Sequence, residues 1–416
     1  MPAITVMLKP ASGLCNMRCR YCFYADEQKN RSVPNYGIMS EEVLRAVLTR
    51  VLDYADGECT IAFQGGEPTC AGLPFFQRVV ELEQELNHKH VVIHNAIQTN
   101  GYVIDDTWAQ FFSDNHFLVG ISLDGPKELH DLNRLDGKGN GTYNRVLRAI
   151  SILKKHCVEF NILTVVTSAT CRSIRKTYSF FQRNGFDYQQ YIPCLDPLGE
   201  NRGQHDYSLT CKAFGQFLKD LFDCWYEDAC RGHLTYNRYF TNLLIILTGQ
   251  QPEACGMLGR CGMQYVVEAD GSVYPCDFYM LDEWRLGNFL TDTVTDIDRK
   301  REERKFIQMS MEVNENCHPC KWYPLCRGGC RRDREPMVNG HLQKNYFCEA
   351  YYEFFEYAYP RLARWKPACS VPISKESGAL YSSAFFILIM KPCPMAAHKK
   401  LAPYLRSTAP NIFYLC

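Results

Sequence analysis

The sequence predicts an α/β protein in which a partial (β/α)6 barrel is followed by a small cysteine-rich domain. Six short β-rich segments alternate with helical segments over roughly the first 190 residues, and from Cys255 onward cysteines and turn residues dominate. Alternating strands and helices are typical of βαβ units in a parallel sheet. Six units are two fewer than a closed (β/α)8 barrel contains, so we expect one side of the barrel to be open.

Each predicted strand is short, rich in β-branched or aromatic residues, and followed by a helical pattern. The strands cover Ile4–Lys9, Thr60–Gln64, Val91–Gln98, Phe117–Leu123, Phe160–Val166 and Tyr188–Pro193. The first long helix begins after Ser40, a typical N-cap residue. The later helices cover Leu73–His88, Trp108–Asn115, Tyr143–His156, Ser173–Asn184, Leu209–Ala229, Tyr236–Leu247 and Tyr351–Trp365.

These patterns divide the chain into three parts. We expect the barrel in residues 1–235, linker helices and the cysteine-rich domain in residues 236–366, and a tail in residues 367–416. Prolines recur in the last part and no helical or strand period is sustained there. We therefore expect this tail to be disordered or non-homologous.

The bulk composition is that of a soluble globular protein, with 46% apolar and 22% charged residues. Lys and Arg together balance Asp and Glu at 46 each, which argues against a nucleic-acid partner. Residues 1–10 lack a secretory signal, and the late apolar run Ala384–Met390 is far shorter than the roughly 20 residues of a membrane span. We expect a cytoplasmic monomer in which eleven of the twenty-two cysteines, those at metal-like spacings, bind metal.

A cysteine loop directly follows the first predicted strand. Cys15, Cys19 and Cys22 have the spacing C-x3-C-x2-C, with Tyr21 before the last cysteine. Three neighbouring thiolates can hold three irons of a [4Fe–4S] cluster and leave the fourth iron open for another molecule. The alternatives are a zinc site or three unrelated buried cysteines. Zinc sites usually combine a C-x2-C pair with a nearby fourth ligand, which this segment lacks.

Further polar motifs follow the later strands, at the barrel end where such folds carry out chemistry. Gly65, Gly66 and Glu67 form a turn after the second strand, and glycines let a backbone approach a ligand closely; the alternative is an ordinary turn. Ser122 ends the fourth strand and can donate to a ribose or carboxylate. Arg134 suits a carboxylate, or a surface salt bridge.

The cysteine-rich domain contains eight cysteines at metal-like spacings, enough for two four-thiolate clusters; the alternative is a pair of zinc ribbons. They are Cys255, Cys261, Cys276, Cys317, Cys320, Cys326, Cys330 and Cys348. Asp277 directly follows Cys276. A carboxylate at this position could accept a proton from a substrate, or it could be a simple turn residue.

Taken together, these motifs resemble the radical S-adenosylmethionine (radical SAM) enzymes that carry a SPASM auxiliary-cluster domain. More narrowly, they resemble the anaerobic sulfatase-maturating enzymes, over Met1 to about Trp365 but not over the tail. The segments that carry this resemblance are Lys9-Pro-Ala-Ser12, Cys22-Phe-Tyr24, Ala62-Phe-Gln-Gly-Gly-Glu-Pro68, Gln98-Thr-Asn-Gly101, Tyr274-Pro-Cys-Asp-Phe-Tyr279 and Phe354-Phe-Glu-Tyr-Ala358.

The resemblance implies three [4Fe–4S] clusters, with S-adenosylmethionine as cosubstrate. Cys15, Cys19 and Cys22 would hold the cluster that binds the cosubstrate. Contacts to the cosubstrate are implied for Tyr21, Gly65, Gly66, Glu67, Ser122 and Arg134, and for Leu195 as an apolar wall beside the adenine, although Leu195 could also be ordinary core. Cys255, Cys261, Cys276 and Cys330 would hold one auxiliary cluster, and Cys317, Cys320, Cys326 and Cys348 the other.

The implied reaction is the oxidation of a cysteine or serine in a sulfatase Cys/Ser-x-Pro-x-Arg motif to Cα-formylglycine. Asp277 would deprotonate the target side chain, and Tyr24 and Gln64 would contact the substrate. The implied partners are an unfolded or nascent sulfatase chain and a low-potential electron donor such as ferredoxin or flavodoxin.

Two other functions are alternatives to this one. One is a different SPASM peptide maturase that forms thioethers or cross-links. Many such enzymes carry an N-terminal leader-binding domain, for which the fourteen residues before Cys15 leave no room. The other is a non-catalytic iron–sulfur electron carrier, which would need neither the glycine turn nor Ser122 and Arg134.

Overall fold

The structure is a computed structural model that describes residues 3–365, and the predicted tail lies outside these residues. One sheet runs through the described chain in the order β10-β9-β8-β1-β2-β3-β4-β5-β6-β7. Its strands are β1 (Ile4–Leu8), β2 (Glu58–Phe63), β3 (Val92–Thr99), β4 (Leu118–Ser122), β5 (Phe160–Val166), β6 (Tyr188–Pro193), β7 (Tyr236–Asn237), β8 (Tyr265–Val267), β9 (Ser272–Tyr274) and β10 (Gly287–Asn288).

The predicted parallel barrel of six strands is confirmed. Each of β1 to β6 pairs in parallel with the next, and β7 adds a further parallel strand at the edge beyond β6. Strand β8 pairs in parallel with β1, while β8–β9 and β9–β10 are antiparallel. The cysteine-rich part therefore extends the barrel sheet.

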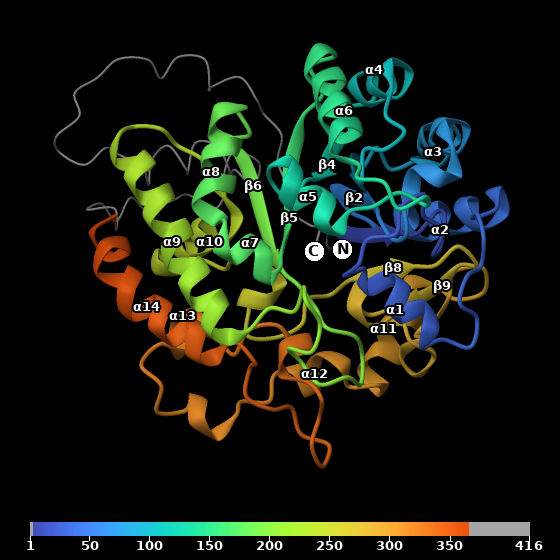
Figure 1. The fold of residues 1–416 in the computed structure, drawn as a ribbon. Helices are drawn as coiled ribbons and strands as arrows, with labels where there is room; N and C mark the ends of the chain where they lie inside the picture. The colour runs from blue at the N-terminus through green and yellow to red at the C-terminus, as the bar shows by residue number, and fades with distance from the viewer. Residues whose placement is uncertain (1–2, 366–416) are drawn as a thin grey trace.

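In Figure 1 the barrel helices such as α2, α3, α4, α6 and α8 lie on the outer side of the curved sheet, and the cysteine-rich part lies below the barrel. The helices of the described residues are α1 (Phe23–Lys29), α2 (Glu41–Tyr54), α3 (Leu73–Leu86), α4 (Asp106–Asp114), α5 (Lys127–Asn133), α6 (Tyr143–Lys155), α7 (Ser168–Arg172), α8 (Ile174–Arg183), α9 (Cys211–Cys230), α10 (Arg238–Leu247), α11 (Val294–Glu303), α12 (Phe306–Ser310), α13 (Tyr323–Cys326) and α14 (Cys348–Leu362). Short 3-10 helices are η1 (Pro68–Ala71), η2 (Cys255–Met257), η3 (Asp277–Tyr279), η4 (Asp282–Trp284), η5 (Glu315–Cys317), η6 (Arg331–Arg334) and η7 (Ala363–Trp365).

Local sequence signals explain where the barrel helices begin. The Ser40 side chain accepts a hydrogen bond from the Val43 backbone at 3.2 Å, as the N-cap prediction required. Asp105 caps α4 in the same way through two backbone N–H groups. The apolar faces of these helices and the outward side chains of the strands form one continuous core, which holds the carboxyl ends of the strands in place.

A second core joins α9, α10 and α14 beside β6. Phe222 packs edge-on against Phe354 with ring centroids 5.8 Å apart, and Phe214 packs against Phe347. In Figure 1, α9 and α14 run side by side at the left of the molecule. This packing positions Cys348, the first residue of α14.

The pairing of β8 with β1 determines where the predicted base lies. The Lys9 backbone N–H donates to the Val267 carbonyl at 2.8 Å, which continues the β1–β8 ladder to the end of the barrel strand. The antiparallel hairpin then returns through β9 to Cys276 and Asp277. Asp277 is thereby brought next to the carboxyl end of β1, although the two are far apart in sequence.

Some sequence predictions need correction or extension. The helix predicted from Tyr236 was wrong for its first two residues, because Tyr236 and Asn237 pair with β6. The helix predicted from Tyr351 begins earlier, at Cys348. The division at residues 235 and 366 stays a prediction. Within residues 3–365, no helix is both long enough and apolar enough to cross a bilayer.

Candidate active site

The cysteine loop connects the end of β1 to the start of α1, at the mouth of the barrel. The thiols of Cys15, Cys19 and Cys22 are partly buried, and Cys22 lies at the N-terminus of α1. The Met17 backbone N–H donates to the Cys15 sulfur at 3.3 Å. Asn100, which follows β3, reaches the same sulfur at 3.8 Å and donates to Asn16 at 2.8 Å.

The charge properties of this loop fit a cationic cluster. Burial raises the pKa of Cys19 to about 12, against the opposing positive charge of Arg134. Burial also raises the pKa of Cys15, and negative charge on Cys19 and Cys22 raises it further. Thiolates are the species that bind iron. Three buried thiolates repel one another, and bound iron would supply positive charge that compensates them.

The glycine turn packs directly against the cysteine loop. Gly65 and Gly66 both have positive φ, at 86° and 40°. A Cβ atom on Gly66 would lie 2.3 Å from the Leu14 carbonyl oxygen, and the Glu67 N–H donates to that same oxygen at 2.7 Å. Glycine at position 66 is therefore needed for the turn to pack against the cysteine loop, and contact of the turn with the cosubstrate stays a prediction.

The Glu67 side chain is engaged by the protein itself. Its carboxylate is buried and accepts hydrogen bonds from the hydroxyls of Thr69 and Thr99, each at 2.6 Å, and from the Asn100 N–H at 2.7 Å. These bonds tie the end of β2 to the end of β3. Glu67 therefore holds the turn in shape, and its contact with the cosubstrate stays a prediction.

Replacing Gly66 by Ala is expected to weaken S-adenosylmethionine binding by about tenfold or more, because the Leu14 carbonyl has to move and the cysteine loop moves with it. Equilibrium binding to the cluster-loaded protein would measure the effect. The matched control is Gly139→Ala, where φ is also positive, at 81°, but no atom lies within 4 Å of the added carbon. Positive φ alone costs roughly 1–2 kcal/mol of stability. Equal binding losses in the two variants would show that strain, not the collision, is responsible.

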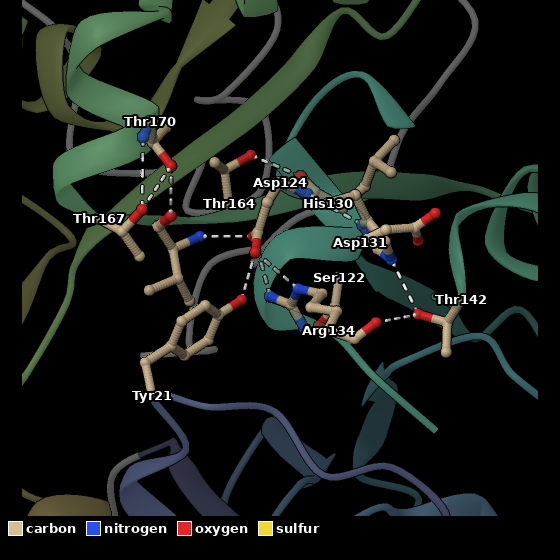
Figure 2. A network of polar contacts seen from close by, with 12 residues as sticks. Tyr21, Ser122, Asp124, His130, Asp131, Arg134, Thr142, Thr164, Thr167 and Thr170 are labelled. Carbon is tan, nitrogen blue, oxygen red and sulfur yellow. Dashed lines mark hydrogen bonds and ion pairs between the residues drawn. The ribbon is translucent and has the colours of Figure 1, made fainter. Parts of the chain in front are cut away.

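A buried polar network connects the cysteine loop to the end of β4, as Figure 2 shows. Arg134 forms a two-pronged ion pair with Asp124, through Nε at 3.0 Å and Nη2 at 3.1 Å. The Tyr21 hydroxyl donates to the same carboxylate. The alternative of a surface salt bridge for Arg134 is therefore wrong, because Arg134 and Asp124 are both buried.

His130 connects to this network through both of its ring nitrogens. Its Nδ1 accepts from the Asp124 backbone N–H at 3.4 Å, and its Nε2 lies 3.0 Å from the Thr142 hydroxyl, which donates to the Arg134 carbonyl. Burial lowers the pKa of His130 to about 4, so the ring is neutral at ordinary pH. Asp124 and His130 lie within the motif around Ser122 and Arg134, but sequence alone assigned them no role.

Ser122 and Leu195 complete the predicted cosubstrate residues. Ser122 ends β4 and accepts a hydrogen bond from Gln98 of β3 at 3.1 Å. Leu195 follows β6, is half-buried and belongs to none of the buried core groups within residues 3–365. This position favours an apolar wall over ordinary core. Its contact with adenine stays a prediction.

Asp277 is fully buried and lies where the two parts of the chain meet. One carboxylate oxygen lies 3.1 Å from the Lys9 ammonium group. The other accepts hydrogen bonds from the Tyr24 hydroxyl at 2.6 Å and from the Gln64 amide at 3.2 Å. These partners come from the end of β1, from α1 and from the end of β2. A simple turn aspartate would have no such set of partners.

Lys9 and Glu27 also belong to this site, although the sequence motifs did not indicate a role for either residue. The Lys9 ammonium group lies 3.7 Å from Glu27 and 4.3 Å from the centre of the Tyr24 ring. Burial raises the pKa of Glu27 to about 8, while Lys9 opposes this and Asp277 adds to it. The sequence did contain one indication, since Lys9 is the last residue of a mostly apolar predicted strand. A lysine buried there needs a buried anion nearby.

The eight cysteines of the second part fall into two groups. Four line one pocket, and they are Cys255, Cys261, Cys276 and Cys330. In the other group, burial raises the pKa of Cys326 to about 12, and negative charge on Cys348, Cys317 and Cys320 adds to this. Both groupings agree with the pairing that the resemblance implied. That they hold iron–sulfur clusters stays a prediction.

Comparison with known proteins first defines the class. Residues 10–181 match the radical SAM superfamily, and residues 255–321 match SPASM, an iron–sulfur cluster-binding domain. The first match covers the barrel from the cysteine loop onward, and the second covers the first part of the cysteine-rich region. The chain is thus a radical SAM protein with a SPASM domain.

The relatives narrow the class further. The chain is 51% identical to a cysteine-type anaerobic sulfatase-maturating enzyme of Clostridium perfringens, over 87% of this chain and 98% of that protein. It is 30% identical to a serine-type enzyme of Bacteroides thetaiotaomicron, over 85% and 89%. The solved structure of native anSMEcpe with bound AdoMet and Kp18Cys peptide matches with 50% identity and a TM-score of 0.84, over 87% and 99%. The chain belongs to the anaerobic sulfatase-maturating enzymes.

Proposed function

We propose that this enzyme oxidises the cysteine of a sulfatase Cys-x-Pro-x-Arg segment to Cα-formylglycine. The observation that carries the proposal is the buried Asp277, held by Lys9, Tyr24 and Gln64 where the cysteine-rich part meets the barrel mouth. The choice of cysteine over serine is supported by identities of 51% to a cysteine-type relative and 30% to a serine-type relative.

Three [4Fe–4S] clusters and S-adenosylmethionine are part of this proposal. Cys15, Cys19 and Cys22 would hold the first cluster, and the two groups of four cysteines would hold the others. Together with S-adenosylmethionine, the first cluster supplies the radical that removes a hydrogen atom from Cβ of the target cysteine, and the others supply electron acceptors. The remaining chemistry depends on residues of the chain itself.

The chain supplies a base beside the target side chain. Asp277 is proposed to take the thiol proton at the carboxylate oxygen that faces Tyr24 and Gln64. Lys9 neutralises the other oxygen, which keeps the buried carboxylate ionised and oriented. Loss of the Cβ hydrogen atom, the thiol proton and one further electron leaves a thioaldehyde. Water then replaces its sulfur, so that the product is the aldehyde and the sulfur leaves as hydrogen sulfide.

The Asp124–Arg134 pair has a separate task in the same scheme. Asp124 is buried and holds the Arg134 fork beside Tyr21 of the cysteine loop. With two of its nitrogens fixed, Arg134 can present its third, Nη1, to the carboxylate of S-adenosylmethionine. The proposal also includes a sulfatase chain as substrate, a low-potential donor such as ferredoxin or flavodoxin, and a monomer in the cytoplasm.

The test is mass spectrometry of two matched peptides after anaerobic turnover with reductant and S-adenosylmethionine. One peptide contains Cys-x-Pro-x-Arg and the other Ser-x-Pro-x-Arg. We expect the cysteine peptide to lose its sulfur and gain an aldehyde about tenfold or more faster than the serine peptide reacts, the discrimination that one changed substituent commonly produces. A thioether or a cross-link as the product would refute the proposal. A serine peptide that reacts faster would refute the cysteine preference.

A further inference from the structure

Arginine side chains surround the pocket of the first cysteine group. Arg260, Arg331 and Arg334 all line the pocket that Cys255, Cys261, Cys276 and Cys330 share. Arg260 is exposed, whereas Arg331 and Arg334 are buried at 2% and 6% exposure. Buried guanidinium groups are costly unless negative charge or hydrogen-bond acceptors compensate them.

Arg331 is held in a cage of three aromatic rings. Its guanidinium carbon lies 5.0 Å from the ring centre of Tyr279, 4.7 Å from that of Trp284 and 4.6 Å from that of Phe306. Rings at these distances attract the cation and exclude water from it. The positive charge is therefore fixed in position, and little solvent screens it from the pocket.

One of the three guanidinium nitrogens of Arg331 has no hydrogen-bond acceptor within residues 3–365. Nη1 donates to the Phe306 carbonyl at 3.1 Å, and Nε lies 3.3 Å from the Glu335 carboxylate. Nη2 is buried and has no acceptor among the described residues. An unpaired buried N–H costs roughly 1–3 kcal/mol, so such a group usually indicates an acceptor that the protein chain does not provide.

Arg334 serves mainly to position the pocket wall. Its Nη1 donates to the Glu312 carbonyl at 2.8 Å, and its Nη2 donates to the Ser310 carbonyl. The Ser310 hydroxyl in turn accepts from the Cys261 backbone N–H at 2.8 Å. Arg334 thus supports Cys261 indirectly. The Nε of Arg334 is also buried without an acceptor in the described part of the chain, but it is Arg331 that combines a spare nitrogen with a charge held by three aromatic rings.

We propose that Arg331 raises the reduction potential of the iron–sulfur cluster held by Cys255, Cys261, Cys276 and Cys330, by presenting its spare N–H and its fixed charge to that cluster. This inference rests on the proposed function, which places a cluster there. Reduction adds negative charge, and a buried cation with an N–H toward sulfur stabilises the reduced form. Because Cys276 adjoins Asp277, the cluster that Arg331 would make easier to reduce is the one beside the proposed site of substrate oxidation.

The test is a potentiometric titration of the anaerobic, fully loaded enzyme, followed by electron paramagnetic resonance. In Arg331→Met, one midpoint potential is expected to fall by at least about 59 mV, which corresponds to a tenfold change in the ratio of reduced to oxidised cluster for one electron. The other midpoints should stay where they are. An unchanged set of potentials, or a common shift of all of them, would overturn the proposal.

A second variant tests the same charge in the opposite direction. Glu335 is the carboxylate that offsets Arg331, at 3.3 Å. Glu335→Gln removes that offset, so the same midpoint is expected to rise. Because this variant keeps the buried arginine and its cage, it tests the proposal even if Arg331→Met does not fold. Absence of a rise would overturn the proposal.

The control and the readout separate this inference from the proposed function. Arg299→Met removes an exposed arginine of α11, whose side chain is 65% accessible, and should leave every midpoint unchanged. Midpoint potentials are measured on the loaded clusters without a peptide substrate. An enzyme that failed to produce formylglycine would therefore refute the proposed reaction and leave the potentials to decide the role of Arg331.

Discussion

Replacing Cys19 by Ala is expected to reduce both 5′-deoxyadenosine and formylglycine production to background. Cys19 is the middle residue of the cysteine loop, and a cluster held by two thiolates would be neither retained nor correctly placed. Loss of the cluster removes the group that S-adenosylmethionine binds. Chromatography of the nucleoside products and mass spectrometry of the peptide would measure the two losses in one reaction mixture.

The matched control for Cys19 is Cys70, another partly buried cysteine close to the same loop. Cys70 lies in η1, and its thiol is near the Asn16 backbone N–H, which helps lower its pKa against the rise caused by burial. Cys70→Ala is expected to retain cosubstrate cleavage and iron content. If it lost both, the loop would hold its cluster with four thiolates, and the open-iron interpretation would be wrong.

Replacing Asp277 by Asn is expected to leave 5′-deoxyadenosine formation in place and to lower formylglycine formation about 100-fold or more. Asparagine has nearly the same shape and can still bond to Tyr24 and Gln64, but it cannot accept a proton from the target thiol. General-base catalysis typically contributes 10²–10⁴-fold to a rate. The ratio of formylglycine to 5′-deoxyadenosine, measured over a time course, isolates this step.

The control for Asp277 is Asp282, five residues along the same segment. Asp282 lies in η4 and accepts a hydrogen bond from the Ser32 backbone at 2.8 Å, at an exposed position. Asp282→Asn should leave the product ratio unchanged. Full formylglycine production by Asp277→Asn would remove Asp277 from the role of base. A parallel loss of 5′-deoxyadenosine would mean that the substitution disturbs the whole site.

Regular local patterns made the barrel predictable. Strands such as Phe160–Val166 and helices such as Tyr143–Lys155 have enough residues to show their own period, and βαβ units follow from their alternation. Strand β8 has only three residues, Tyr265–Val267, and shows no period. Its pairing with β1 depends on a contact between distant parts of the chain. For that reason the sequence did not show that one sheet joins the two domains.

In the candidate site, too, some features were predictable from the sequence and others depended on the fold. Arg134 was identified as a carboxylate-binding residue, but whether it faced solvent or Asp124 depends on how α5 packs over β4. Lys9 and Glu27 were missed, because a charged residue near a motif resembles any surface residue until its burial is known. Asp277 was identified by resemblance. Its partners Lys9, Tyr24 and Gln64 came from the fold.

The sequence by itself determined that the chain has a three-cysteine loop, a glycine turn one strand later and eight further cysteines. Residues within one loop stay close together in any fold, because the chain connects them. Spacing alone left open which cysteine joins Cys255, Cys261 and Cys276; the resemblance implied Cys330, and the tertiary structure places all four in one pocket lined by Arg331. Only the tertiary structure decided that Asp277 lies beside the end of β1. Contacts across more than fifty residues depend on how sheet and helices pack, and no local spacing specifies that.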